Sequence, residues 1–488
     1  MQRINRVAPC FASLALACST IAGAAEWDVS KSLQVGEVYS DNVGLSGTNK
    51  DDRWITVVRP SIDLSGKGSR VQVDFTGALQ YSNLDGTTDT VQPQFFGAAD
   101  AELIEDFFFL ETEMSARQTA INPFSPFGVS NLDTRGNTTT TYDYSVSPSL
   151  VHAFSGFART ELKYSYQSQI NDDDALDDSD RHLAVFSLVN GRDFTRVIWG
   201  LQANYSKTDY EDRVGQISLF QGSDNEFKSA SVRLGYRFTR QFSLSAIYGK
   251  ERNDFISQLD TDDDYWDASA VWTPNERVNL TLGYGERFFG DAPSVDLSYR
   301  NKRLTLNARY FKELTDASSL RQRGIGQSGF GGFGGFGRTG GGSLPFFGDA
   351  LSGSRDFTSL ENATFLNAQY SLGINYQAGR TSISIDGSRS EQARVDIARE
   401  SIFSRYSVTV GRQLSSKLNL DIGYGWDRRT DTALAEFSTT EWINFAVSRQ
   451  LGQNTSLTFN YRNTDRDSRV FNDGYGGNTY SLFLSITF

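Results

Sequence analysis

The sequence predicts an all-β protein, a single antiparallel transmembrane β-barrel of about 22 strands in a bacterial outer membrane. Three observations support this: a secretory signal at the N-terminus, apolar residues at every second position, and connections that alternate between short and long. The strand count ranges from about 18 to 22, because weak segments can merge with their neighbours. The composition agrees, since the 488 residues include 44 Gly, 35 Phe and 21 Tyr.

Residues 1–24 have the order of a secretory signal peptide. Arg3 and Arg6 precede an apolar stretch, and Ala22-Gly23-Ala24 supplies the small residues that a signal peptidase requires. Residues 25–488 are then the mature barrel. Both cysteines lie in the removed segment, so no disulfide is expected, and lipidation of Cys18 is the alternative.

The charge and the hydropathy exclude two classes of protein. The formal net charge is −12, and loss of the two signal-peptide arginines makes it −14. Such an acidic chain is not expected to bind nucleic acid, which needs clustered Lys and Arg. After residue 24 no continuous apolar run has the length of a membrane helix, so a helical membrane protein is excluded.

Period-two alternation is the strongest local signal. Val71, Val73 and Phe75 alternate with polar residues, and similar runs begin at Phe242, Val278, Leu304 and Leu418. Each run ends in a tyrosine at the same distance from a short turn. Such tyrosines predict an aromatic girdle at the membrane interface. The predicted girdle comprises Tyr81, Tyr248, Tyr284, Tyr310 and Tyr424.

The connections predict which end of the barrel faces the periplasm. Short turns such as 66–68, 274–276 and 301–302 alternate with longer polar loops such as 119–137 and 315–363. Short periplasmic turns and long extracellular loops are typical of outer-membrane barrels. An even number of strands would place both termini on the short-turn side.

The last strand carries a second, independent signal. Apolar residues alternate with Ser and Thr up to a terminal phenylalanine, which resembles the signal that the barrel assembly machinery recognises. The residues of this predicted assembly signal are Tyr480, Leu482, Leu484, Ile486 and Phe488.

The face opposite the tyrosines is expected to line the lumen. A charge on the lipid face costs about 2–4 kcal/mol at the membrane midplane, so charged residues on the strands should point inward. They could shape a field across the pore or bind sugar, or they could be ion pairs that stiffen the wall. The lumen-facing candidates are Asp74, Lys163, Arg233, Arg237, Asp296, Arg300, Arg309, Asp386, Arg405 and Asp421.

Several patterns imitate chemical sites without their context. Residues 329–334 satisfy G-x-G-x-x-G, but they lie in the Gly/Phe-rich tract 324–342 and not between a strand and a helix. The acidic runs near 172–180 and 260–264 lack EF-hand spacing. His152, expected in a short turn, and His182, at the start of a strand, are not flanked by a catalytic motif. We therefore expect no enzyme, catalytic residue, metal or cofactor.

One N-terminal segment is similar to a known family. Tyr39-Ser40-Asp41-Asn42-Val43, followed by Val57-Val58-Arg59-Pro60, resembles the opening of outer-membrane barrels associated with the PEP-CTERM/exosortase system. The wider group consists of putative β-barrel porins of the second type, which accompany exopolysaccharide biosynthesis. The resemblance implies one barrel and a role in polysaccharide export or display, and it transfers no catalytic residues.

These observations lead to one functional hypothesis and two alternatives. We expect a passive conduit for exopolysaccharide export. A general or solute-specific porin for uptake, and a closed structural barrel or adhesin that binds through its loops, are the alternatives. The strand pattern starts near Trp27 without a preceding plug, which argues against a siderophore-type transporter. Expected partners are outer-membrane lipid and lipopolysaccharide, the barrel assembly machinery, polysaccharide and periplasmic export components.

Overall fold

The computed structural model describes the chain from residue 26 to residue 488. Within that range it leaves out 85–88, 123, 127, 129–131, 135, 174, 212–223, 259, 317–318, 320–362, 434 and 470–472. The predicted signal peptide and the Gly/Phe-rich tract 324–342 therefore lie outside the described residues.

Every regular element of the described chain is a β-strand. The strands are β1 (Glu26–Ser40), β2 (Arg53–Lys67), β3 (Val71–Leu84), β4 (Asp89–Ile104), β5 (Phe108–Ala120), β6 (Thr138–Phe154), β7 (Ala158–Asn171), β8 (Ser179–Asn190), β9 (Val197–Tyr210), β10 (Asn225–Arg237), β11 (Phe242–Asp254), β12 (Asp263–Asn275), β13 (Val278–Arg287), β14 (Gly290–Asp291), β15 (Ser294–Arg300), β16 (Leu304–Asp316), β17 (Thr364–Ala378), β18 (Thr381–Arg394), β19 (Glu400–Ser415), β20 (Leu418–Asp431), β21 (Glu436–Gln450), β22 (Thr455–Ser468) and β23 (Tyr475–Thr487).

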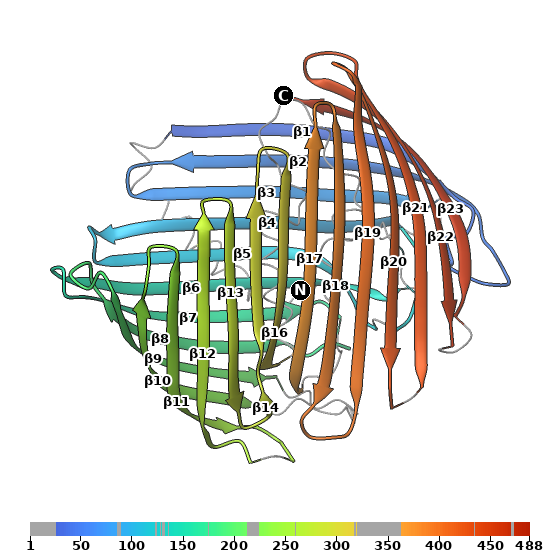
Figure 1. Ribbon diagram of the computed structural model, residues 1–488. Coiled ribbons are helices and arrows are strands. Elements are labelled where there is room, and N and C mark those ends of the chain that lie inside the picture. Colours follow the sequence, from blue (N-terminus) through green and yellow to red (C-terminus); the bar gives the residue numbers. More distant parts are fainter. Residues whose placement is uncertain are drawn as a thin grey trace.

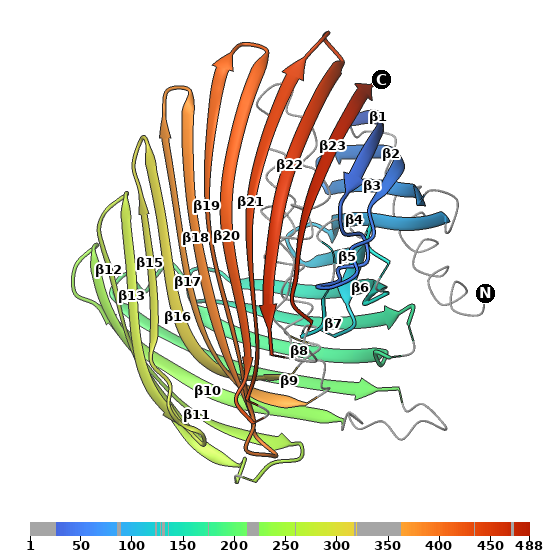
Figure 2. The same ribbon diagram turned by 90° about the vertical axis from the view of Figure 1, so that its right-hand side faces the viewer.

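The strands form one closed antiparallel sheet. Each strand pairs with the next along the chain, and β1 closes the barrel by pairing with β23 from Ser32 to Ser40. Because β14 and β15 both pair with β13 and form one interrupted strand, the barrel has 22 strands, as the sequence predicts. In Figure 1 the strands of the far wall run across those of the near wall, as strand tilt in a barrel requires. Figure 2 shows β1 beside β23 at the closure.

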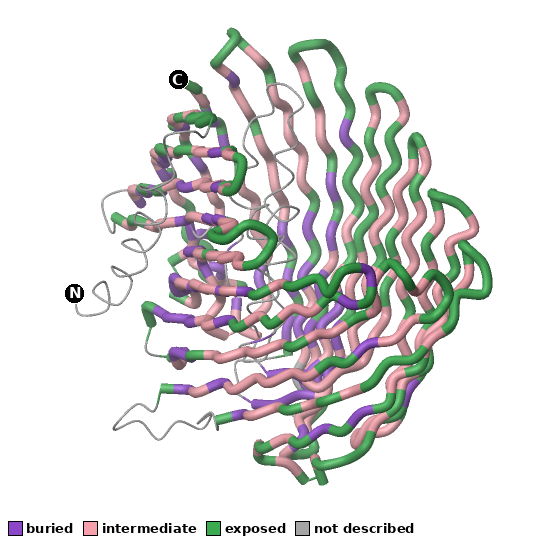
Figure 3. Tube along the Cα trace, turned by 90° about the vertical axis from the view of Figure 1, so that its left-hand side faces the viewer, coloured by how far each residue is buried: buried purple, intermediate pink, exposed green. Residues whose placement is uncertain are grey.

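Side chains alternate between the lipid face and the lumen. On β23, for example, Tyr480, Leu482 and Leu484 are exposed on the outside, whereas Ser481 and Phe483 are buried inside. A similar alternation of burial is seen toward the long-loop ends of other strands, such as β3 and β20 (Figure 3). An apolar outer row and a polar inner row are what a barrel in a bilayer needs. Among the described residues, no helix has the length and apolar character to cross a membrane.

Two local features differ from the sequence-based expectation. The outer connection between β13 and β14 is a tight turn at Phe288–Phe289, where the sequence shows no long polar loop. His152 lies within β6 and not in a short turn, because the strand continues to Phe154 and the chain reverses at Ser155, which has a positive φ of 54°. Both cases show that the strand ends depend on pairing with the neighbour and not on polarity alone.

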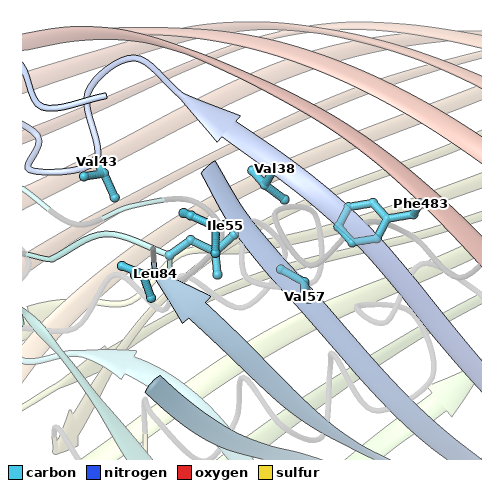
Figure 4. Close-up of a cluster of buried hydrophobic side chains, with 7 residues drawn as sticks. Val38, Val43, Ile55, Val57, Leu84 and Phe483 are labelled. Carbon is cyan, nitrogen blue, oxygen red and sulfur yellow. The ribbon is translucent and has the colours of Figure 1, made fainter. Parts of the chain in front are cut away.

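An apolar cluster lies inside the barrel. Val38, Ile55, Leu84 and Phe483 extend from the inner faces of β1, β2, β3 and β23 and are at most 4% exposed. Figure 4 shows these side chains with Val43 and Val57 beside the strands. Val43 and Leu132 complete the cluster from the loops 41–52 and 121–137. The cluster therefore fixes two loops against the inner wall.

Candidate functional site in the barrel lumen

The strand register places the predicted lumen residues on the inner rows. Asp74 shares a row with Ser65 and Asp296 shares one with Arg309, while exposed apolar side chains occupy the outer rows of the same strands. The inner rows contain Asp74, Lys163, Arg233, Arg237, Asp296, Arg300, Arg309, Asp386, Arg405 and Asp421. The structure brings only some of these residues into contact with each other.

Several of the inner charges have a partner on the wall. Arg309 donates to Asp296 at 2.8 Å, and Lys163 forms an ion pair with Glu111, which the sequence analysis did not single out. Arg233 and Asp267 occupy one row on either side of β11. These contacts match the interpretation that inner charges stiffen the wall, because paired charges constrain the neighbouring strands.

Other predicted residues contact uncharged groups. Asp74 accepts hydrogen bonds from Ser65 and Gln72, both at 2.9 Å, and Asp386 accepts one from Ser384 at 2.7 Å. Arg237 donates to the Thr195 carbonyl at the short-turn end. These bonds hold each charge in a defined position on the inner surface.

Arg405 belongs to an aromatic group that the sequence analysis missed. Its guanidinium lies 5.4 Å from the ring of Trp442, and Arg462 lies 5.2 Å from the same ring. Trp442 lies across Gly425, where an added Cβ would be 2.0 Å from the ring. Two cations on one indole form a rigid polar and aromatic surface. The signal in the sequence was Gly425 in the middle of a strand, since a strand glycine often marks a close approach.

Charge is unevenly distributed around the short-turn end of the lumen. Asp74, Asp100, Glu111 and Glu113 lie on the inner face of β3–β5, with Lys163 as the neighbouring cation. Arg300 and Arg309 lie on β15 and β16, in the opposite wall. Figures 1 and 2 show β3–β5 and β16 on opposite sides of the barrel. A solute that enters from this end therefore passes between an acidic wall and a wall where Arg300 adds a positive charge beside the Arg309–Asp296 ion pair.

The inner rows become more buried from the short-turn end toward the long-loop end. Arg233 and Arg300 are exposed near the short turns, whereas Thr208, Asp316 and Asn367 near the long loops are all 0% exposed. These buried groups bond across strands: Thr208 donates to Asp316 at 3.4 Å, and Ser390 donates to Asn367 at 2.8 Å. The lumen is thus more open at the short-turn end and filled near the long-loop end.

The loop 121–137 crosses this outer end. The ring of Phe124 lies 6.1 Å from that of Phe403 on β19, and its carbonyl accepts a 2.5 Å bond from Arg466 on β22. The Thr134 N–H donates to the Val43 carbonyl. A small cavity of about 80 Å³, lined by Val38, Leu132 and Arg462 among others, lies between this loop and the wall. The apolar Phe124 and Leu132, within a loop predicted only as polar, were the available signal.

The segment that resembles a known family closes the barrel. Asp41 accepts two 2.7 Å bonds from Asn478, one from the backbone N–H and one from Nδ2. Asn42 donates to the Gly476 carbonyl at 3.1 Å, and the ring of Tyr39 lies 6.3 Å from that of Tyr480. These residues therefore join the first outer loop to the last strand, which is a structural role.

The predicted girdle tyrosines lie on the outer rows. Tyr81, Tyr248, Tyr284 and Tyr424 are between 38% and 62% exposed, and Tyr310 stacks on Tyr370 with ring centroids 4.5 Å apart. The hydroxyls of Tyr248 and Tyr284 each donate at 2.7 Å to an aspartate on the long-loop side, Asp264 and Asp291. A ring at apolar depth with its hydroxyl on a polar group is the geometry of an interfacial girdle.

The residues of the predicted assembly signal lie on β23, except Phe488, which directly follows it. Tyr480, Leu482, Leu484 and Phe488 are exposed, and Phe488 donates its N–H to the Lys31 carbonyl of β1. The strand lies between β22 and β1, so it is the last to be joined in chain order.

The acidic runs have local structural contacts. Asp173 accepts from the Ala175 N–H and Asp178 accepts from the Asn171 N–H, at 2.7 and 2.8 Å. Within the described ranges, no group of three or more His, Cys, Asp or Glu side chains is arranged to hold a metal ion.

Comparison with known proteins identifies a fold and no family. No protein-family model and no curated protein matches the chain. Among solved structures, a variant of the ferric enterobactin receptor PfeA from Pseudomonas aeruginosa, in complex with enterobactin, has a TM-score of 0.52 at 11% identity, over 95% of this chain and 82% of the receptor. The iron transporter FrpB from Neisseria meningitidis has a TM-score of 0.50 at 9% identity, over 94% and 83%. At such identity the likeness shows the fold alone.

Together, the closed 22-strand barrel and these neighbours make the chain a bacterial outer-membrane protein. Its apolar outer rows contact the membrane lipid.

Proposed function

We propose that the protein is a solute-specific channel for uptake of a polar, saccharide-like solute across the outer membrane. One observation carries the proposal: a polar lumen that is open at the short-turn end narrows where loop 121–137 crosses the long-loop end. A loop that crosses the lumen restricts which solutes can pass, and a purely structural barrel would need no open polar vestibule.

The lining chemistry suits a solute that carries many hydroxyl groups. Ser, Thr, Asn and Gln on the inner rows, such as Ser231, Asn307 and Asn375, offer hydrogen bonds that a passing solute can exchange one by one. Such bonds contribute about 0.5–1.5 kcal/mol each, which favours passage without trapping. The acidic wall of the vestibule and the positive charge of Arg300 opposite it would orient a dipolar solute before it reaches the narrow end.

Liposome swelling tests the proposal. The refolded mature barrel is expected to admit small saccharides faster than neutral polymers of the same size. Phe124→Ala together with Leu132→Ala should release the crossing loop, raise the conductance and reduce this discrimination. Ile256→Ala is the control, because the Ile256 side chain lies in another long loop and is 65% exposed. This change should alter neither the conductance nor the discrimination between solutes. Equal permeability of all solutes of one size in the unaltered barrel would refute solute specificity.

The direction of transport is tested in cells. A deletion strain should take up the permeant saccharide more slowly and should keep its surface polysaccharide. A strain that loses surface polysaccharide while uptake is unchanged would support export, the function that the similarity at residues 39–43 implies.

A further inference from the structure

A second cavity lies in the lumen, on the wall formed by β8–β13. Its volume is about 150 Å³, and it opens among inner-row side chains near the long-loop end. The residues that determine its chemistry are Arg181, Asn204, Phe227, Glu251, Asn253 and Arg287. It is distinct from the small cavity beside loop 121–137, which lies against β21–β23 and β1.

The cavity has a rigid frame. Arg287 donates to both oxygens of Glu251, at 3.2 and 2.5 Å, and its guanidinium lies 5.4 Å from the Tyr265 ring. Glu251 is 2% exposed, so this bidentate pair is held away from water. The end of β16 forms another side, where Asp316 accepts bonds from the N–H and the hydroxyl of Ser319 at 2.7 and 2.8 Å. The carboxylates of Glu251 and Asp316 therefore both accept hydrogen bonds from other residues of the protein.

Arg181 is the cation of this lining that forms no ion pair among the described residues, although the buried carboxylate of Asp316 lines the same cavity. In the part of the chain that the structure describes, its side chain makes one bond, from Nε to the Ser206 hydroxyl at 3.1 Å, and no ion pair. Its remaining guanidinium nitrogens can therefore donate to a ligand. The side-chain amides of Asn204 and Asn253, also in the lining, suit hydroxyl groups, and Phe227 supplies an apolar ring.

We propose that this cavity binds an acidic sugar unit, with Arg181 donating to its carboxylate. The inference rests on the proposed function and narrows its substrate class to saccharides that carry a carboxylate. A guanidinium pairs with a planar carboxylate through two parallel bonds, which a neutral sugar cannot reproduce. The amides receive the sugar hydroxyls, and the Phe227 ring faces the carbon-bound hydrogens of the sugar.

Calorimetry on the full mature barrel, refolded in detergent, tests this assignment. The probes are trigalacturonate, the neutral galactotriose and acetate. We expect trigalacturonate to bind at least about 10-fold more tightly than galactotriose or acetate, a difference of about 1.4 kcal/mol. Arg181→Gln should remove that preference, and Arg181→Lys should restore part of it. Arg240→Gln, an exposed arginine in the short turn between β10 and β11, should leave it unchanged. Heat-modifiable gel mobility shows that each variant is folded.

Three results would overturn the proposal. These are equal binding of the acidic and neutral trisaccharides, an unchanged preference in folded Arg181→Gln, and an equal loss in Arg240→Gln. Acetate binding as tight as trigalacturonate would show a carboxylate site that does not recognise sugar, and would also overturn it.

Liposome swelling separates this proposal from the proposed function. Sugar binding that depends on Arg181, without saccharide flux through the barrel, would support the binding site and refute the proposed channel. Selective saccharide flux without a preference for acidic sugars would support the channel and refute the binding site.

Discussion

Removing the Asp41 carboxylate should weaken the closure of the barrel. Asp41 accepts two bonds from Asn478, both at 2.7 Å, and Asn478 in turn accepts a 3.0 Å bond from the Tyr461 hydroxyl. Hydrogen bonds to a charged group contribute about 1.5–3 kcal/mol each. Because both residues are only partly buried, water can replace some of this energy. We therefore expect Asp41→Ala to lower the free energy of unfolding by about 2 kcal/mol.

Urea unfolding of the refolded barrel in detergent micelles measures this change. Asp28→Ala is the matched control, because Asp28 lies on β1, the strand that Asp41 directly follows, is exposed, and makes no hydrogen bond or ion pair in the described structure. The control should differ from the unaltered protein by less than about 0.5 kcal/mol. A value for Asp41→Ala inside that margin would refute the structural role assigned to the 39–43 segment. A second sign of a weakened closure would be a lower temperature for the heat-dependent shift in gel mobility.

Three further predictions concern the lumen and the loops. Gly425→Ala should displace Trp442 from its place between Arg405 and Arg462, because the new Cβ would lie 2.0 Å from the Trp442 ring. The tryptophan fluorescence should therefore shift. Gly373→Ala is the control and should cause no shift, because the nearest atom to its new Cβ is 3.6 Å away. Burial would by itself raise the pKa of Asp396, but hydrogen bonds from Arg394 and from the backbone lower this pKa below its ordinary value. The stabilisation of the fold by this carboxylate should therefore be present above the ordinary pKa and be lost as the pH falls through the lowered pKa. Denaturant unfolding as a function of pH should show that loss in the unaltered protein and not in Asp396→Asn. Deletion of 324–342 should raise single-channel conductance if this tract narrows the pore, and an unchanged conductance would exclude that role.

The periodicity of the sequence was enough to predict the barrel. An alternating run such as Leu418–Tyr424 has only one amphipathic form, a strand with one apolar face, and many such runs with short turns can satisfy their backbone only by closing into a barrel. The girdle follows from the same rule, because a tyrosine at constant distance from the turn has a constant depth in the membrane. For this reason the fold and the range of 18 to 22 strands needed no tertiary information, whereas the structure fixed the number at 22.

The residues of the inner rows could be assigned from the sequence, because every second residue of a strand faces the lumen. The contacts between these residues could not be assigned in this way. Asp296 and Arg309 are neighbours in register and form an ion pair, whereas Arg181 forms none with the described residues although Asp316 lines the same cavity. Which charges meet depends on the strand register and on loops that enter the pore, and local patterns do not encode either one. The same limit explains why Trp442, Arg462 and Glu251 were missed.

The sequence by itself determined that this chain is an acidic outer-membrane barrel with a polar interior, because strand periodicity and turn length are local properties. Only the tertiary structure decided that residues 39–43 join the first loop to the last strand, that loop 121–137 crosses the outer end, and that Arg181 lines a cavity. Each of these features joins segments far apart in the chain, such as Asp41 and Asn478 or Phe124 and Arg466. Such contacts arise only when the sheet closes, since closure brings the two ends of the chain and opposite walls of the barrel within bonding distance.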